Sequence, residues 1–437
     1  MKAVFHIPPN EYTFVETLLS ILSRKYPDVD ILLAVGSPQE ADAIKALSPN
    51  IADTGRFIPS SRIYFLFPFP AQVYVTPEQY GVTPRYYPSI CCFHGQPSKG
   101  LTLAKGLVCN FDYFFSYGPF HTNVLKKFLD KNLGGIPPHL EIREVGYPKS
   151  DRVIQGHWNR EEVLRGIGLD PERKTLIYAP AFNEGASLRE FGPQLVGILS
   201  SMESCNVIIK LSVDNFSAAS NEYANGGVNW FEALASFEAL PNVYLSRERL
   251  VDPYLAAADV LITDVSSVSF EFMVLGKPVV FIDTPCFFSR TLKKYFPHED
   301  TEKWRDRPDV NAGREFGIVA QNLEELPEAI RTALAKGYNK DFRDRMRERL
   351  LYNPGCAAEA AADAIHDILL QESRRGILAR AVRYLHNIVR PAALKVLLKQ
   401  LAPGLFLRLR ALKDIISKRV DYDFINRSEA VHDRKNI

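Results

Sequence analysis

The chain of 437 residues is long enough for two domains of ordinary size and an appendage, and 46% apolar residues suffice for sizeable cores. Six cysteines show neither C-x-x-C pairs nor a regular spacing, which excludes a disulfide framework and predicts reduced thiols in a cytosolic protein. No apolar run approaches a membrane-spanning length, and the first residues, broken by Pro8-Pro9, do not have the pattern of a signal peptide. We therefore expect a globular protein that meets any membrane from one side.

The formal net charge of +2 conceals an uneven distribution. Residues 374–419 carry twelve basic side chains against the single acid Asp414, a charge of +11 that leaves −9 for the rest. An acidic body argues against nucleic-acid binding there and assigns any anionic partner to the basic segment.

In chain order, the sequence predicts two successive sets of alternating strands and helices. The first set has strands at 2–7, 31–35, 61–67, 89–93 and 113–116 and a helix at 12–25. After Gly146-Tyr147-Pro148 the second set has helices at 161–166 and 192–202 and strands at 175–179 and 207–211. This pattern predicts an α/β fold of two Rossmann-like domains facing a cleft, at 1–150 and 151–345, with a closing helix at 346–373. Ligands of such sheets bind beyond the carboxyl ends of the strands.

The stretch from Asp252 to Asp283 is the most informative part of the second set. Its pattern predicts a helix at 252–258, a strand at 260–263, a helix at 266–275 and a strand at 279–282. The turn Asp264-Val265-Ser266-Ser267 lies where a strand ends and a helix begins, so free backbone N–H groups there favour an anion. The two serines could donate to phosphate oxygens or simply cap the helix.

Another loop with chemical potential follows the apolar strand at 89–93. It begins with His94, a side chain suited to general base catalysis, followed by Gly95 and, five residues after the histidine, by Lys99. A histidine that only caps the strand end is the alternative. The loops Gly146–Asp151, Pro180–Gly185 and Lys210–Asp214 also follow predicted strands, and each alone would fit an ordinary connection.

Residues 374–437 predict a basic tail of two or three short amphipathic helices. Apolar residues recur on one helical face, at Ile377, Leu378, Ala381, Val382, Leu385, Ile388 and Val389. Arg380, Arg383 and Arg390 lie off that face. We expect this tail to bind an anionic membrane surface, since each basic residue near such a leaflet contributes about 1 kcal/mol. Packing on the body or on a second subunit is the alternative.

Taken together, these motifs resemble the CDP-glycerol glycerophosphotransferase family, whose members build teichoic acids and related phosphate-linked polymers. The residues that carry the resemblance are His94-Gly95-Gln96-Pro97-Ser98-Lys99-Gly100, Gly146-Tyr147-Pro148-Lys149-Ser150-Asp151, Tyr178-Ala179-Pro180-Ala181-Phe182, and Leu261-Ile262-Thr263-Asp264-Val265-Ser266-Ser267 through Gly276-Lys277-Pro278. The resemblance implies a GT-B type transferase with the nucleotide on the C-terminal domain and the acceptor on the N-terminal one. It also implies a peripheral position on the cytoplasmic face of the bacterial cell membrane.

The sequence departs from the family pattern at several positions. Ser212 stands where the family's K-x-H-P has its histidine, Thr102 replaces the closing glycine of the first motif, and Val265 replaces the tyrosine of D-Y-S-S. The donor pocket is therefore altered, and a nucleotide sugar is an alternative to a CDP-activated polyol.

The activity that we expect is transfer of a glycerol-phosphate-like group from CDP-glycerol or a similar donor to a hydroxyl of a lipid-linked or polymeric cell-surface acceptor, with release of CMP. His94 would be the general base, with Gly95 and Gln96 on the acceptor side. The donor and its phosphates would be held by Lys99, Pro180, Lys210, Asp264, Ser266, Ser267 and Glu271, with Glu271 on the ribose. This chemistry requires no metal or other cofactor. A GT-B glycosyltransferase of cell-surface polysaccharide synthesis and a non-enzymatic assembly scaffold are the alternatives.

Overall fold

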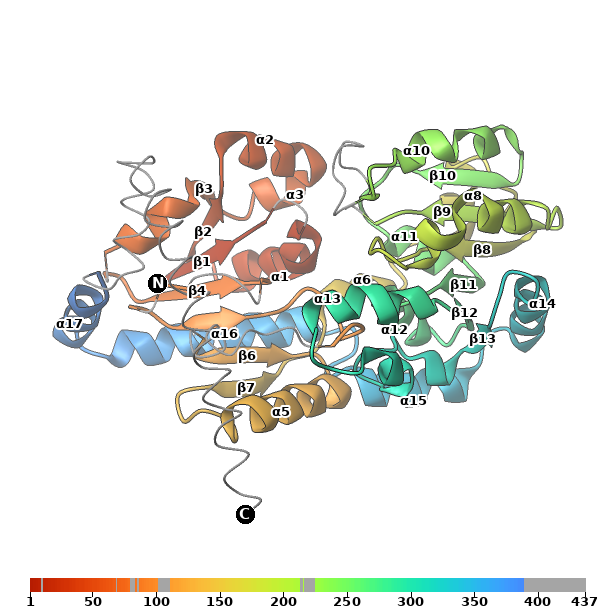
Figure 1. Ribbon diagram of the computed structural model, residues 1–437. Helices are drawn as coiled ribbons and strands as arrows, with labels where there is room; N and C mark the ends of the chain where they lie inside the picture. The colour runs from red at the N-terminus through yellow and green to blue at the C-terminus, as the bar shows by residue number, and fades with distance from the viewer. Residues whose placement is uncertain are drawn as a thin grey trace, which may run out of the picture.

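The computed structural model describes residues 1–388, apart from 9–10, 68, 79–82, 85, 101–110, 213–214 and 216–224. The predicted tail beyond residue 388 lies outside the described residues, as do Thr102 and Val213. Figure 1 shows two α/β units side by side, one built from the N-terminal half of the chain and one from the C-terminal half.

The N-terminal half forms a parallel sheet of seven strands in the order β3-β2-β1-β4-β5-β6-β7. The strands are β1 (Lys2–His6), β2 (Asp30–Val35), β3 (Arg56–Pro59), β4 (Gln72–Thr76), β5 (Ser89–Cys91), β6 (Tyr113–Ser116) and β7 (Glu141–Glu144). The central strands β1, β4 and β5 are almost continuously buried, as expected of a parallel sheet covered on both faces. Since β1 is followed in space by β2 on one side and by β4 on the other, the strand order reverses between β1 and β4.

The C-terminal half forms a parallel sheet of six strands in the order β10-β9-β8-β11-β12-β13. These are β8 (Lys174–Tyr178), β9 (Cys205–Lys210), β10 (Val243–Ser246), β11 (Val260–Thr263), β12 (Val279–Ile282) and β13 (Ile318–Ala320). Here the order reverses between β8 and β11. The predicted α/β class with two Rossmann-like sheets is confirmed.

Helices cover the sheets and connect them. The first group is α1 (Tyr12–Lys25), α2 (Pro38–Leu47), α3 (Pro49–Ala52), α5 (Pro119–Leu133), α6 (Asp151–Ile154), α7 (Arg160–Gly166), α8 (Ser187–Ser200) and α10 (Trp230–Ala233). The second group is α11 (Asp252–Ala257), α12 (Val268–Met273), α13 (Lys293–Tyr295), α14 (Leu326–Lys336), α15 (Lys340–Leu350), α16 (Ala357–Arg374) and α17 (Ile377–Ile388). Short 3-10 turns are η1 (Ser60–Phe65), η2 (Pro148–Ser150), η4 (Ala235–Ala239), η6 (Thr301–Asp306) and η7 (Arg314–Phe316), and η5 (Phe287–Leu292) is a π-helical turn.

The strand predicted at 61–67 is wrong, because that segment begins as the 3-10 helix η1. Prolines precede and follow it at Pro59, Pro68 and Pro70, and proline cannot donate to a strand ladder. The prediction of a helix at 266–275 was too long, since α12 spans only Val268–Met273.

Helix α16 returns from the second half of the chain to the first, where it packs on α1, β4 and β1 (Figure 1). Its apolar face, including Ile365 and Leu369, is buried in the N-terminal core. Asp151, the last residue of the Gly146–Asp151 motif, accepts hydrogen bonds from the N–H groups of Ala357 (3.1 Å) and Ala358 (2.7 Å). That motif therefore holds the start of α16 against the first domain.

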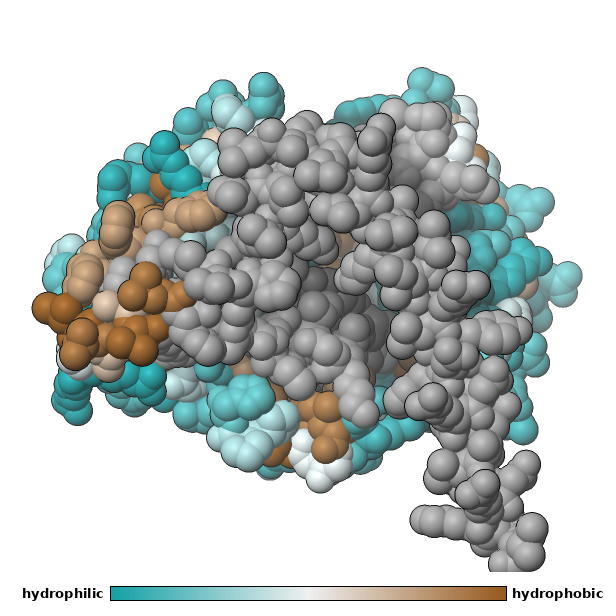
Figure 2. Space-filling view, turned by 60° about the vertical axis from the view of Figure 1, so that its left-hand side comes forward, coloured by the Kyte–Doolittle hydropathy of each residue, from teal (hydrophilic) through white to brown (hydrophobic). Residues whose placement is uncertain are grey.

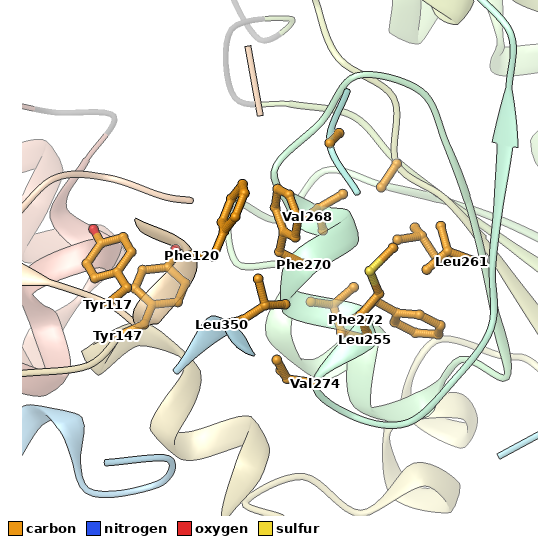
Figure 3. Close-up of a cluster of buried hydrophobic side chains, with 14 of the residues drawn as sticks. Tyr117, Phe120, Tyr147, Leu255, Leu261, Val268, Phe270, Phe272, Val274 and Leu350 are labelled. Carbon is orange, nitrogen blue, oxygen red and sulfur yellow. The ribbon is translucent and has the colours of Figure 1, made fainter. Parts of the chain in front are cut away.

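Apolar side chains from both halves form one continuous cluster between the sheets (Figure 3). Phe120 of α5 packs on Phe270 of α12, with ring centroids 5.4 Å apart, and Leu350 at the end of α15 is buried in the same cluster. Tyr117 and Tyr147 extend the cluster into the first half. The domains are thus joined by a hydrophobic core and not only by the chain.

Phe270→Ala should remove a buried ring from this shared core and lower the free energy of unfolding by about 3–5 kcal/mol. Phe67→Ala is the matched control, because the Phe67 side chain is 72% exposed and its loss should change stability by less than about 0.5 kcal/mol. Urea denaturation of both variants measures the difference. Equal effects would contradict the assignment of Phe270 to a shared core.

Candidate functional site

The first half of the site lies at the carboxyl ends of the N-terminal strands, next to the reversal of strand order. His94 follows β5, and its Nδ1 lies 3.3 Å from the carbonyl oxygen of Pro77, which follows β4. A carbonyl can only accept, so this hydrogen bond requires the proton on Nδ1 and leaves the Nε2 lone pair to take another proton. The His94 side chain is 41% exposed and so is accessible to a substrate.

The backbone around His94 has an uncommon conformation that helps to aim the imidazole. Phe93 has φ 57°, in the left-handed region that a bulky aromatic residue rarely adopts. Its buried ring packs edge-on against Phe114 (5.3 Å) and His121 (4.7 Å), which holds the strained residue in place. The Tyr117 hydroxyl also donates to the Cys92 carbonyl at 2.8 Å.

The second half of the site lies at the reversal of strand order in the C-terminal sheet, where Asp264 follows β11 and the loop from Ala179 follows β8. The buried carboxylate of Asp264 accepts hydrogen bonds from the N–H of Ala181 (2.8 Å) and from the N–H (2.7 Å) and hydroxyl (2.6 Å) of Ser187. Burial raises the pKa of Asp264, and these hydrogen bonds oppose the rise. Asp264 therefore neither caps α12 nor bonds to the serines beside it, but fixes the loop after β8, which contains Pro180.

Ser266 and Ser267 are half-buried at the start of α12, and neither side chain caps that helix. Within the described part of the chain, no hydrogen bond engages either hydroxyl, so both can donate to a ligand. Because α12 is only six residues long, its dipole adds little, and the hydroxyl and N–H groups would make the contacts.

The two halves meet where Gly95 faces Ser267. A Cβ built on Gly95 would lie 3.2 Å from the Ser267 hydroxyl oxygen, and the φ of Gly95 is 153°. A side chain at position 95 would crowd this contact, which explains glycine directly after the histidine. The His94 loop of one domain thus lies beside the serine turn of the other.

Lys99 crosses between the domains in the same region. Its ammonium donates to the Asn183 side-chain oxygen at 2.6 Å and lies 5.1 Å from the centre of the Phe182 ring. The following Gly100 N–H donates to the Asp309 carbonyl at 2.7 Å. A cation is therefore held beside the loop after β8, near Asp264, whose charge it influences.

Gln96 and Lys210 are both more buried than the sequence suggested. The Gln96 amide nitrogen donates to the Leu350 carbonyl at 2.6 Å, so this side chain ties its loop to α15. Lys210, at the end of β9, donates to the Leu211 carbonyl at 2.9 Å, and burial lowers its pKa to about 8. Gln96 at the acceptor and Lys210 at the donor phosphates stay predictions.

Glu271 lies in a polar contact between the domains. Its two oxygens accept from Lys149 Nζ (2.6 Å) and from the Tyr147 hydroxyl (3.2 Å), and Asp252 is buried nearby. Burial would lower the pKa of Lys149, but the two carboxylates outweigh it and the pKa is raised. The predicted ribose contact of Glu271 is not tested, and it would have to share the carboxylate with these two donors.

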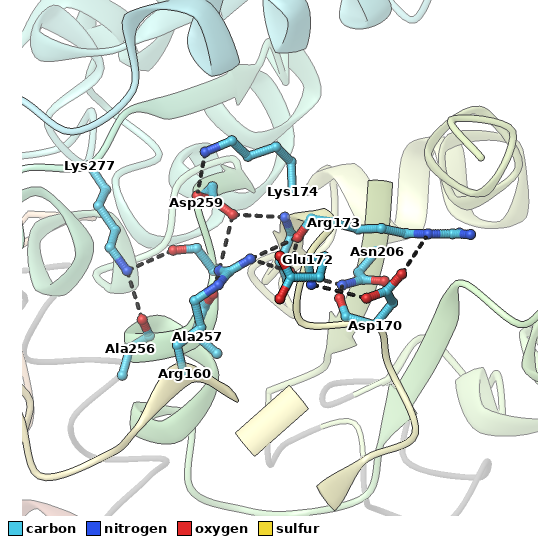
Figure 4. A network of polar contacts seen from close by, with 12 residues as sticks. Arg160, Asp170, Glu172, Arg173, Lys174, Asn206, Ala256, Ala257, Asp259 and Lys277 are labelled. Carbon is cyan, nitrogen blue, oxygen red and sulfur yellow. Dashed lines mark hydrogen bonds and ion pairs between the residues drawn. The ribbon is translucent and has the colours of Figure 1, made fainter. Parts of the chain in front are cut away.

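Lys277, part of the motif that ends the Asp264 block, lies at the opposite edge of the sheet (Figure 4). Its ammonium donates to the carbonyls of Ala256 (2.8 Å) and Ala258 (2.7 Å) at the end of α11. Nearby, Asp259 pairs with Arg160 (3.0 Å) at the amino ends of the strands. Lys277 thus has a structural role in this conformation, away from the facing loops.

The sequence analysis did not single out Glu11, and it gave no site role to Tyr147, Lys149 or Asn183, although these three lie in motifs or loops that it named. The rule that sites form where strand order reverses would have directed attention to Glu11, in the connection between β1 and α1, and to Asn183 after β8. Across the described ranges, no group of three or more His, Cys, Asp or Glu could hold a metal ion. The expectation of metal-independent chemistry stays a prediction.

Two parallel α/β sheets with facing post-strand loops define a GT-B-like fold. The wall teichoic acid polymerase TagF is similar in fold, with a TM-score of 0.58 at 16% identity over 85% of this chain and 89% of that one. A TagF variant soaked with CDPG gives a TM-score of 0.57 at 15% identity, again over 85% and 89% of the two chains. At these identities the similarity establishes the fold alone.

Residues 235–360 match the sequence model of the family described as CDP-Glycerol:Poly(glycerophosphate) glycerophosphotransferase. The match covers the Asp264 block, the part of the chain that carries most of the resemblance, and confirms that resemblance. A teichoic acid glycerol-phosphate transferase of Staphylococcus aureus is 23% identical over 179 residues, which are 39% of this chain and 41% of that protein. A teichoic acid poly(glycerol phosphate) polymerase of Bacillus spizizenii is 24% identical over 205 residues, 45% and 46% of the two chains. The matched region thus spans less than half the length of either relative.

Asp264→Ala should leave three buried donors without their acceptor and lower the free energy of unfolding by about 3 kcal/mol or more. Ser266→Ala is the control from the same turn, with an expected change below about 0.5 kcal/mol, because its hydroxyl makes no bond within the described residues. Thermal and urea unfolding measure both variants. Unchanged stability in Asp264→Ala would show that this carboxylate does not organise the loop after β8.

Proposed function

We propose that this protein transfers a glycerol-phosphate-like group from a CDP-activated donor to a hydroxyl of a lipid-linked or polymeric cell-surface acceptor, with release of CMP. The observation that carries the proposal is the contact between the His94-Gly95 loop and the Ser266-Ser267 turn. One domain supplies a base with a free Nε2, and the other supplies hydroxyl donors without a partner in the described chain. The family match over residues 235–360 and the similarity to a TagF structure soaked with CDPG support the choice of a CDP-activated donor.

In this mechanism Nε2 of His94 takes the proton of the acceptor hydroxyl as its oxygen attacks the donor β-phosphorus. The bond from that phosphorus to the bridging oxygen breaks, and CMP leaves with the electron pair. Ser266, Ser267 and Lys99 stabilise the charge that builds on the phosphates, because phosphoryl transfer depends mainly on positioning and electrostatics. Lys210 would add a second cation, provided that it turns from the Leu211 carbonyl towards the donor.

Ser212, in place of the family histidine, keeps a nucleotide-sugar donor as a second candidate. Purified protein assayed with CDP-glycerol, other CDP-polyols, CMP-sugars and UDP-sugars distinguishes the two. Release of CMP from a CDP-polyol supports the proposal, whereas release of UDP, or of CMP from a CMP-sugar only, would replace it with glycosyl transfer.

His94→Ala should lower kcat by about 10²–10⁴-fold, because the proton of the attacking hydroxyl would have no acceptor. Donor binding measured by calorimetry and the melting temperature should stay nearly unchanged. Near-normal turnover in a folded His94→Ala protein would reduce this residue to a structural cap of β5.

We also propose a peripheral position on an anionic membrane surface through residues 374–419. In the described chain no helix is long and apolar enough to cross a bilayer. Helix α17 nevertheless exposes Ile377 (60%), Leu378 (78%), Val382 (59%) and Leu385 (62%). Figure 2 shows hydrophobic surface on the side where Figure 1 places α17. Exposed apolar residues within a segment of charge +11 fit a membrane-surface helix better than a helix packed on the body.

Leu378→Gln with Leu385→Gln should weaken binding of the full chain to anionic vesicles, because the apolar contact with the bilayer is lost. Leu47→Gln with Leu240→Gln is the matched control, since these leucines are exposed elsewhere, at 44% and 38%. Binding of the unaltered chain should also weaken as salt rises. If both pairs sediment equally with vesicles, or salt has no effect, residues 374–419 do not mediate membrane binding.

A further inference from the structure

Glu11 lies between β1 and α1, and its carboxylate is directed at the predicted base. Its Oε1 is 3.6 Å from Nδ1 of His94, and its side chain is 20% exposed. Although Glu11 occupies the N-cap position of α1, its side chain makes no capping hydrogen bond to that helix. Capping of α1 therefore does not explain a glutamate at this position.

Two segments, the start of α1 and the loop after β4, surround the imidazole of His94. The carbonyl of Pro77, after β4, lies 3.3 Å from Nδ1, and the ring of Phe14, in α1, lies 5.9 Å from the imidazole at a tilt of 59°. Glu11 is the charged member of this group. Because Pro77 and Glu11 both approach Nδ1, their joint effect is to keep the proton there and the other nitrogen available.

We infer that Glu11 is the positioning residue of His94, acting on the imidazole and not on the substrate. A carboxylate beside the protonated nitrogen fixes the tautomer and stabilises the imidazolium that forms when Nε2 takes a proton. No covalent step is added, since Glu11 neither gains nor loses a proton in the reaction. The inference rests on the proposed role of His94 as general base.

The same edge of the sheet offers a comparison pair that the inference does not involve. His6, at the end of β1, lies 3.6 Å through Nδ1 from the carboxylate of Glu78, after β4, and 3.4 Å from the Thr76 hydroxyl. The charge type and distance equal those of the His94–Glu11 pair. Glu78→Gln therefore removes one negative charge from the same region without touching the ring of His94.

The test compares turnover of Glu11→Gln, Glu11→Asp and Glu78→Gln in the full-length protein with CDP-glycerol and a hydroxyl acceptor. Glu11→Gln should lower kcat by about 10²-fold, with the donor KM and the melting temperature unchanged. Glu11→Asp, which keeps the charge on a shorter side chain, should recover a large part of that loss. Glu78→Gln should stay within about threefold of the unaltered protein, because it leaves the His94 ring in place.

A double variant separates this inference from the proposed function. If Glu11 acts through the histidine, Glu11→Gln should cause no further loss of kcat in the His94→Ala background. Normal turnover of Glu11→Gln beside a severe loss in His94→Ala would overturn the inference and leave the proposed function intact. Equal losses in Glu11→Gln and Glu78→Gln would also overturn it, since a general effect of negative charge would then suffice. A near-normal His94→Ala protein would instead remove the base itself, and with it the proposed function.

Discussion

The contact between the two α/β halves is the constraint on which the candidate site depends. Each sheet brings its post-strand loops to one edge, with His94 and Lys99 on the first set of loops and the Ser266-Ser267 turn on the second. The shared apolar core around Phe120 and Phe270 brings the two edges together, and the buried pair of Lys149 and Glu271 adds a polar contact of defined geometry. Moving the two side chains apart would leave both charges buried without a partner. The contact therefore resists small displacements of one half against the other. Helix α16, held by Asp151, returns to the first sheet and limits how far the halves can separate.

Much of this arrangement could be predicted from sequence because it depends on local patterns. Apolar runs predicted β1, β2, β5 and β6 of the first sheet and β8, β9, β11 and β12 of the second, but β3, β4, β7, β10 and β13 were not predicted. The strand from Val260 to Thr263 was placed correctly, as was the turn that begins at Asp264. The prediction for residues 61–67 was wrong because their apolar side chains suggested a strand. The surrounding prolines have no N–H group to donate to a neighbouring strand. Apolar content alone does not separate these outcomes.

The side-chain contacts of the candidate site could not be predicted from the sequence, because they join segments that are far apart in the chain. Asp264 bonds to Ser187, 77 positions away, and Lys99 to Asn183, 84 positions away, so no spacing rule connects them. Glu11 and His94 likewise come together only because β1, β4 and β5 lie next to one another in the sheet. The sequence identified Asp264 and His94 as candidate residues, but the bonds that Asp264 makes and the neighbours of His94 depend on the strand order.

In the proposed function, the transferred phosphate lies between His94 and the Ser266-Ser267 turn. A crystal structure of the protein soaked with CDP-glycerol measures this most directly. We expect the diphosphate within hydrogen-bonding distance of both serine hydroxyls, with Nε2 of His94 facing the β-phosphorus across the space that an acceptor hydroxyl would occupy. A nucleotide bound elsewhere, for instance with its diphosphate distant from both serines and from Lys99, would contradict the account.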